Sequence, residues 1–493
     1  MAYYQAMQSR HAKTLFHLLF SSLVGLCSLC HAAPIDLPNL GDGASRLISP
    51  QLEQEIGSAF LKQLHASLPL VGDPILQYYV ETQLADLVQY SNLRSPLQAV
   101  VIVDDEELNA FAAPGGIIGI NLGLMIYARD LDEYASVMAH ELAHLSQRHF
   151  ARRVEAQQAA SIPTLVSTIA AILVGVAGGS DAGLAALTTA QAMGQASQLR
   201  FSREREIEAD RIGLNTLVRA NLDPAGMARM FERMQQAYRF TRKPPEFLLT
   251  HPLSESRISD AKSQARDYEK TPPRQARPER AEDYQLMRAR AESRFSQNPR
   301  NEIKTYRKAR SKNVDDAAVT YALALALSKN GEHVEAVDLM RGIYQADSNR
   351  VLMMAAFAEL LIAAEQYREA RQILERGLAL YPDSYPLSMM LARAATAEKR
   401  YAVAEILLEG QSKRRPVDLS VWFELAETAG LAGNVTGVHL ARAEYFFLNG
   451  AYHRAIQHLE YAKRLTPASN QQLNAKLSQR IQDLRVAMRR ASS

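Results

Sequence analysis

The chain has 493 residues, of which 47% are hydrophobic and 22% are charged, a balance that excludes a wholly disordered chain and a fibrous repeat. Its 56 Lys and Arg residues against 53 Asp and Glu residues give a net charge of +3, which excludes the strongly basic surface typical of nucleic-acid-binding proteins. The length is enough for about two to four domains, each with its own core.

The first 32 residues have the layout of a secretory signal peptide. Two cations, Arg10 and Lys13, precede an apolar run over 15–29, and small residues follow it. An uncleaved anchor is the alternative, but the run is short for a membrane span of about 20 residues. We therefore expect cleavage after about Ala32, which removes both cysteines and leaves 54 cations against 53 anions. A metal in the mature chain then needs His and carboxylate ligands, because no thiolate remains.

Residues 33–269 are predicted to form one α+β domain. Amphipathic helices are expected at 52–65 and 75–90, followed by a strand at 98–103. Two further extended segments flank Pro114-Gly115-Gly116, which is typical of a turn. Asp130, with Glu133 three residues later, predicts the capped start of the next helix.

A proline-rich stretch over 270–280 is predicted to be a stiff linker. Beyond it, Ala336, Ala370 and Ala404 recur every 34 residues, each with another alanine 12 residues before it. Small residues at these offsets let two antiparallel helices pack closely, and the pattern resembles the tetratricopeptide repeat. Residues 281–493 are therefore predicted to be an all-α solenoid that ends in a capping helix.

The motif His140-Glu141-Leu142-Ala143-His144 predicts a metal site. Residues four apart on a helix share a face, so both imidazoles can reach one ion, whereas Glu141 lies beside it. A carboxylate there can accept a proton from the attacking water and pass it to the leaving amine. A hydrolytic zinc site also needs a third protein ligand and an open position. His149 is not expected to supply that ligand, because nine residues after His140 it faces away on a continuous helix.

The acidic run 202–210 is the better source of a third ligand. Glu206 and Asp210 lie one helical turn apart and share a face. Spacing alone does not choose among Glu204, Glu206 and Glu208. It also leaves open a solvated helix face that binds no metal.

The H-E-L-A-H motif, followed about sixty residues later by S-R-x-x-E-x-x-A-D, resembles the zinc peptidases that include the CAAX prenyl proteases and the HtpX-type membrane proteases. The resemblance implies that Glu206 is the third zinc ligand and that Asp210 is a catalytic group, supporting the site or donating a proton. The N-A-F-A-x-P-G-G pattern at 109–116 also matches, and it leads into an edge strand suited to pairing with an extended substrate. The domain order, with a signal peptide before this domain and repeats after it, is similar to that of the periplasmic branch of the family. The implied fold is a zincin-type α+β domain followed by the repeat solenoid.

The function that the resemblance implies is that of a periplasmic zinc endopeptidase with one Zn²⁺ per chain, held by His140, His144 and Glu206. Its implied substrates are unfolded or misassembled outer-membrane β-barrel proteins. The repeats would bind these clients or the outer-membrane assembly machinery. The alternative is a chaperone or assembly scaffold with a mainly structural zinc, although such a site has no use for Glu141 beside an open position.

Two features are left with alternatives. Residues 156–199 are strongly apolar and nearly uncharged, which fits a flap over the cleft, a surface for membrane or apolar clients, or a buried helical hairpin. A single span is excluded because it would separate His140 from Glu206 across the bilayer.

His251 precedes a proline in an element that the family commonly has near the zinc. It lines the cleft, packs a loop, or binds zinc as a fourth, inhibitory ligand, and we favour the last. Arg257 is expected to pair with a carboxylate of the site.

Overall fold

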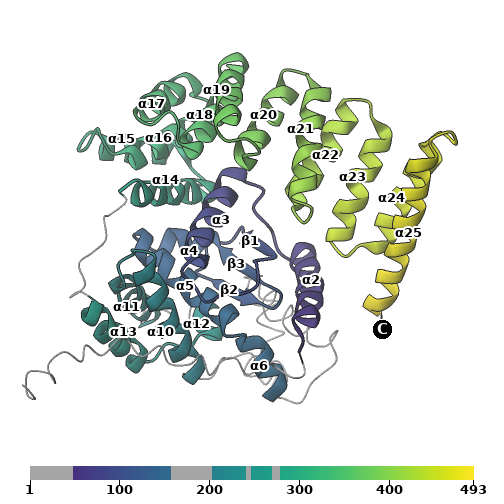
Figure 1. The fold of residues 1–493 in the computed structure, drawn as a ribbon. Coiled ribbons are helices and arrows are strands. Elements are labelled where there is room, and N and C mark those ends of the chain that lie inside the picture. Colours follow the sequence, from purple (N-terminus) through teal and green to yellow (C-terminus); the bar gives the residue numbers. More distant parts are fainter. Residues whose placement is uncertain (1–47, 157–202, 240–245, 269–277, 493) are drawn as a thin grey trace, which may run out of the picture. The chain divides into compact units, whose positions relative to one another are not determined.

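The computed structural model describes residues 48–156, 203–239, 246–268 and 278–492 (Figure 1). The expected signal peptide at 1–32 lies outside these ranges, as do nearly all of the apolar segment 156–199 and most of the linker 270–280. Across the described ranges, no helix combines the length and the apolar character that crossing a lipid bilayer requires.

The first two helices confirm the predicted ones. Helix α2 (Pro50–Ser67) and helix α3 (Pro74–Val88) each begin with a proline, which has no N–H to leave unsatisfied in the first turn. Ser49 caps α2 by accepting a hydrogen bond from Leu52, and Asp73 caps α3 in the same way.

Three strands form a sheet in the order β1-β3-β2. Strand β1 (Ala99–Val103) runs parallel to β3 (Ile117–Asn121), and β2 (Ala110–Ala113) pairs with β3 as the predicted antiparallel hairpin. Gly115 and Gly116 form its turn with φ angles of 77° and 81°, which favour glycine. Strand β2 therefore lies at one edge of this sheet.

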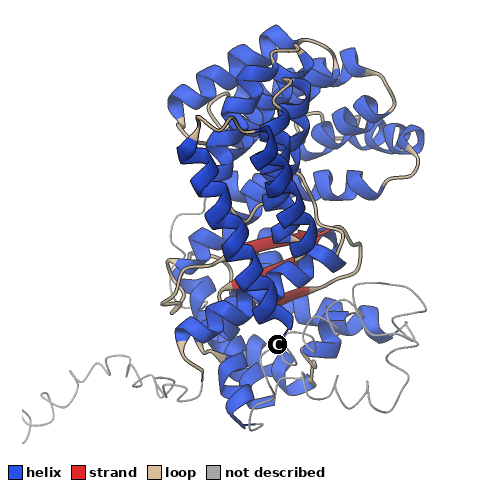
Figure 2. Cartoon of the chain, turned by 90° about the vertical axis from the view of Figure 1, so that its right-hand side faces the viewer, coloured by secondary structure: helices blue, strands red, loops and turns tan. Residues whose placement is uncertain are grey.

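Helices cover both faces of the sheet, as Figures 1 and 2 show. Phe60 of α2 packs edge-on against Phe111 of β2 on one face, with 6.4 Å between the ring centroids. On the other face, Ile118 of β3 shares a core with α3, α4 (Leu122–Tyr127) and α5 (Leu131–Ser146). Burial of the strands on both sides explains their nearly continuous apolar sequence.

Helix α5 begins where the capping pattern predicts. Asp130 accepts a hydrogen bond from the Glu133 N–H at 2.8 Å, and the Glu133 carboxylate accepts one from the Arg129 N–H. The rest of this half consists of α6 (His149–Ala156), α10 (Arg203–Arg219), α11 (Ala225–Arg239), α12 (Glu246–Thr250) and α13 (Glu255–Tyr268).

The second half is made of helix pairs, as predicted. Ala336, Ala370 and Ala404 are fully buried, each on the second helix of its pair. The helices are α14 (Pro278–Phe295), α15 (Pro299–Arg310), α16 (Ala317–Lys329), α17 (His333–Ala346), α18 (Val351–Ala363), α19 (Tyr367–Leu380), α20 (Tyr385–Ala397), α21 (Tyr401–Arg414), α22 (Leu419–Leu431), α23 (Val435–Leu448), α24 (Tyr452–Leu465) and α25 (Gln471–Ser492).

Helix α14 joins the two halves through buried polar contacts. The Tyr284 hydroxyl lies within hydrogen-bond distance of the carbonyls of Met125 and Ala128, at 2.8 and 2.9 Å. Arg290, only 7% exposed, donates to Asp73, which caps α3, and to Glu359 of α18. One hydrophobic core runs from the sheet into the first repeats, so the repeats pack on the first half directly.

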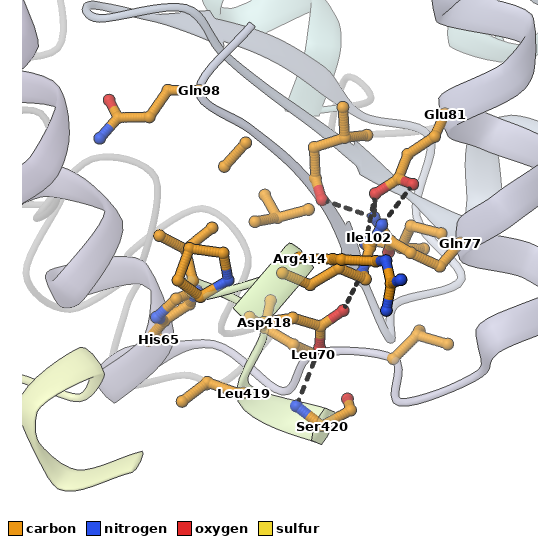
Figure 3. A pocket seen from close by; sticks show the side chains of 17 residues that line it. His65, Leu70, Gln77, Glu81, Gln98, Ile102, Arg414, Asp418, Leu419 and Ser420 are labelled. Atoms are coloured by element: carbon orange, nitrogen blue, oxygen red, sulfur yellow. Dashed lines mark hydrogen bonds and ion pairs between the residues drawn. The ribbon is translucent and has the colours of Figure 1, made fainter. Parts of the chain in front are cut away.

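A cavity of about 300 Å³ lies between β1 and residues 414–420, which include the loop between α21 and α22 of the repeats (Figure 3). Arg415 in this loop donates to Glu81 of α3 at 2.6 and 2.9 Å and to Asp418 at 2.9 Å. Asp418 also accepts a hydrogen bond from the Ser420 N–H at 3.0 Å, which caps α22. The loop is therefore attached to α3 by charged groups on one side of the cavity.

Candidate active site

Four buried side chains from three segments converge on one point: His140 and His144 of α5, Glu206 of α10, and His251 just after α12. One ligand atom from each lies within 4.8 Å of the others. His140 Nε2 is 3.0 Å from His144 Nε2 and 3.3 Å from His251 Nδ1. Glu206 oxygens lie 3.5 Å from both Nε2 atoms and 3.2 Å from His251 Nδ1.

These separations fit a single metal ion. Nitrogen and oxygen ligands at about 2.0–2.2 Å from a tetrahedral zinc ion are about 3.3 Å apart, and the measured distances span 3.0 to 3.5 Å. The donor set of three imidazoles and a carboxylate also suits zinc. In the described ranges, no second group of three or more such side chains lies close enough to hold a metal.

Helix geometry brings Glu206 into the cluster instead of its neighbours. Glu206 is 1% exposed and points toward α5, whereas Glu204 is exposed and Glu208 is half-buried on another side of α10. Helix α10 comes close to α5 because Gly213 has no side chain: a β-carbon there would lie 3.1 Å from the His140 nitrogen. The arrangement matches the ligand assignment that the family resemblance implies.

Asp210 and Arg257 surround the ligands. An Asp210 oxygen lies 2.9 Å from His140 Nδ1, and the Asp210 carboxylate accepts two hydrogen bonds from Arg257 at 2.6 and 2.7 Å. Arg257 also lies 2.8 Å from a Glu206 oxygen, so it pairs with two carboxylates of the site. Because both oxygens of Asp210 are engaged, the geometry favours a supporting role for Asp210 over proton donation.

Glu141 is buried beside the cluster and is not one of its four members. Its carboxylate lies 3.5 Å from His251 Nε2. Burial raises the pKa of Glu141, although the nearby His251 and His140 oppose this rise. A carboxylate with a raised pKa is a more effective proton acceptor near neutral pH. Helix α5 packs against the edge strand β2, so Glu141 lies near backbone that an extended peptide can reach.

The protonation states of the ligands follow from their surroundings. Burial raises the pKa of Glu206, but His251 and His140 outweigh it and lower that pKa well below its usual value. Burial lowers the pKa of His144 well below its usual value. His140 differs, because hydrogen bonds to Asp210 and Glu206 overcome burial and raise its pKa to about 10.

His149 is not turned away from the site, so that prediction is wrong. It is fully buried, and its Nδ1 lies 2.8 Å from His144 Nδ1. The prediction assumed one continuous helix, but α5 ends at Ser146 and Arg148 has a φ of 49°. Helix α6 therefore starts in a new direction at His149, which the spacing of apolar residues does not reveal.

Comparison with known proteins gives the family. Residues 74–265 match peptidase family M48, and residues 279–350 and 361–427 match tetratricopeptide repeats. A putative beta-barrel assembly-enhancing protease from Vibrio cholerae is 30% identical over 436 residues, which cover 88% of this chain and 89% of the relative.

Two further relatives, named beta-barrel assembly-enhancing protease, come from Escherichia coli K12 and Yersinia pestis. The first is 29% identical over 480 residues, covering 95% of this chain and 96% of the relative. The second is 30% identical over 423 residues, covering 85% and 86%. These matches confirm the predicted peptidase domain followed by repeats. The chain belongs to the M48 metallopeptidases that carry tetratricopeptide repeats, together with the beta-barrel assembly-enhancing proteases.

Proposed function

We propose that this metallopeptidase is a zinc endopeptidase of the periplasm that acts in outer-membrane protein assembly and degrades misassembled β-barrel proteins. The names of its relatives support the link to β-barrel assembly. The predicted signal peptide supports export, and the donor set of His140, His144 and Glu206 supports zinc as the metal.

The observation that carries the proposal is the place of Glu141 beside the metal cluster. His140, His144 and Glu206 would hold a zinc ion, which would supply a Lewis acid for the scissile carbonyl and would lower the pKa of water. Glu141 accepts the proton of the attacking water and then delivers it to the leaving amine. Asp210 and Arg257 keep His140 and Glu206 in place while this happens. The edge strand β2 offers main-chain groups to an extended substrate.

His251 restrains the enzyme in this proposal. Its Nδ1 lies 3.3 Å from His140 Nε2 and 3.2 Å from a Glu206 oxygen, so it takes the fourth coordination position that a hydrolytic site keeps open for water. The His251 ring stacks on the Phe247 ring, with 4.6 Å between the centroids. The backbone N–H of His251 donates a hydrogen bond to the Phe247 carbonyl at 2.8 Å. Cleavage then requires His251 to leave the cluster.

The repeats are proposed to bind clients or the assembly machinery. Their helices pack directly on the peptidase half through Tyr284 and Arg290, so a protein held by the repeats is brought to the enzyme at a limited range of distances. A repeat domain packed in this way can deliver a client to the active site more directly than a repeat domain attached by a free linker could.

The test is the substitution Glu141→Gln, which keeps the shape of the side chain and removes its basicity. Cleavage of one unfolded β-barrel protein should fall by about 100- to 10,000-fold, the usual contribution of a general base. Zinc content and binding of the client should stay at the wild-type level. Unchanged cleavage at full zinc content would favour the alternative, a scaffold in which zinc is structural.

A further inference from the structure

The two histidine ligands are supported differently on the side that faces away from the metal. Both present Nε2 to the cluster. His140 Nδ1 lies 2.9 Å from an oxygen of the Asp210 carboxylate. His144 Nδ1 instead lies 2.8 Å from His149 Nδ1, and His149 Nε2 lies 3.1 Å from a Glu208 oxygen. A second imidazole therefore stands between this ligand and a carboxylate.

Only one placement of protons satisfies both of these bonds and leaves the His144 Nε2 lone pair for a metal. His144 carries its proton on Nδ1 and donates it to the lone pair of His149 Nδ1. His149 carries its proton on Nε2 and donates it to Glu208. The tautomer of each ring is thus determined by the next group, and the series ends at a carboxylate that is always an acceptor when ionised.

We propose that His149 and Glu208 are positioning residues that hold His144 in its metal-binding tautomer and orientation and increase its affinity for the ion. Outer partners of this kind orient metal-ligating histidines and raise their basicity. Burial supports the assignment: His149 is fully buried in a helix start, where a polar ring needs hydrogen-bond partners.

The groups behind His140 and those behind His144 also have matching charges. Asp210 is paired with Arg257, and Glu208 is paired with Arg152 at 3.1 Å. Each ligand histidine is therefore backed by a carboxylate and an arginine, directly for His140 and through His149 for His144. This inference rests on the proposed role of His144 as a ligand. It gives Glu208, a candidate ligand of the acidic run, a supporting role instead, and it adds His149, which the helix spacing had placed away from the site.

The experiment measures the zinc dissociation constant of the full chain by competition with a chromophoric chelator. His149→Leu should weaken zinc binding by about 10- to 100-fold, the usual effect of losing an outer partner. His149→Asn should recover most of this loss, because its amide oxygen takes the place of Nδ1 and accepts the His144 proton. Glu208→Ala should weaken binding in the same direction. Glu204→Ala, at an exposed position on the same helix, is the matched control and should leave binding unchanged.

Three results would overturn the proposal. If His149→Leu and His149→Asn lower the thermal midpoint alike while zinc binds as in the wild type, His149 only packs the start of α6. If His149→Leu does not fold, Glu208→Ala decides, and wild-type affinity in that variant contradicts the proposal. If Glu206→Gln binds zinc as tightly as the wild type, the metal site itself is wrong. That last result differs from one in which Glu206→Gln loses zinc as expected and only the His149 and Glu208 variants bind it like the wild type.

Discussion

Gly213 of α10 lies against the backbone of His140 on α5, where a β-carbon on Gly213 would be 3.1 Å from the His140 nitrogen and 3.2 Å from the Ala139 carbonyl carbon. Gly213 follows Glu206 by two helical turns and shares its face. The missing side chain therefore controls how near Glu206 comes to His140.

Gly213→Val should separate α10 from α5 and displace Glu206 from the histidines. We expect the cleavage rate to fall by about 100-fold, as is common when a catalytic group moves by about 1 Å, and zinc content to fall with it. Gly342→Val is the matched control, because nothing lies within 4 Å of the β-carbon position at Gly342. Wild-type activity in Gly213→Val would show that the helices tolerate the extra volume without moving the ligand.

The three glutamates of the acidic run should respond differently to amide substitution. Glu206→Gln should remove most of the bound zinc, because its carboxylate lies in the cluster. Glu208→Gln should cause a smaller loss, since the amide oxygen can still accept the proton of His149. Glu204→Gln should have no effect at its exposed position. Metal analysis of the purified variants measures all three, and an equal loss throughout would show that the run is only a helix surface.

Local sequence signals predicted much of this fold. Proline and side-chain caps and the Gly115-Gly116 turn each act within a few residues, and the alanines of the repeats recur at a fixed period of 34 residues, so a single sequence shows them. His140, Glu141 and His144 were also predicted from spacing, because they lie on one unbroken helix. Glu206 was identified only through the family resemblance, since spacing alone did not separate it from Glu204 and Glu208.

The long-range parts could not be predicted in this way. The break at Arg148 turns His149 back toward His144, and no local pattern marks the positive φ there. The contacts of Tyr284 and Arg290 with the peptidase half join residues more than 150 positions apart. Such contacts depend on how whole helices pack, which periodicity does not encode.

Two arginines on α14 provide a matched test of how the halves are held together. Arg290 is buried with Asp73 and Glu359, so Arg290→Met leaves two carboxylates without their cation and should cost about 3–5 kcal/mol of unfolding free energy. Arg294 pairs with Asp104 but is 38% exposed, so Arg294→Met should cost about 1 kcal/mol or less. Urea unfolding of the two variants measures the difference. Equal small losses would mean that the Arg290 pairs contribute little to stability.

Asp283 should make stability depend on pH. Burial raises the pKa of Asp283 from its ordinary value of 3.8 to about 6, although the Arg350 guanidinium, 3.2 Å away, opposes the rise. The folded state then holds a proton that the unfolded state releases, so the unfolding free energy falls as pH rises from about 4 to about 6. Asp283→Asn should remove this fall. The unfolding free energy of the variant minus that of the wild type should therefore be about 2–3 kcal/mol larger at pH 7 than at pH 4. Denaturant unfolding at several pH values checks this, and a difference that does not change with pH would contradict it.

His251→Ala separates the three roles considered for this residue. If His251 fills the fourth ligand position, its removal opens that corner to water, and proteolysis of an unfolded β-barrel protein should rise. If it binds substrate or stabilises the oxyanion, the rate should fall by about 100- to 1,000-fold. If it only packs against Phe247, the thermal midpoint should drop while the specific activity of folded enzyme stays the same. The placement of Nδ1 at 3.2 Å from Glu206 and 3.3 Å from His140 supports the first outcome.

Zinc content must be measured in both the wild type and His251→Ala, because His251 can also contribute to metal affinity. A clear fall in rate at full zinc content would therefore rule out self-inhibition and leave a direct role for His251 in the reaction.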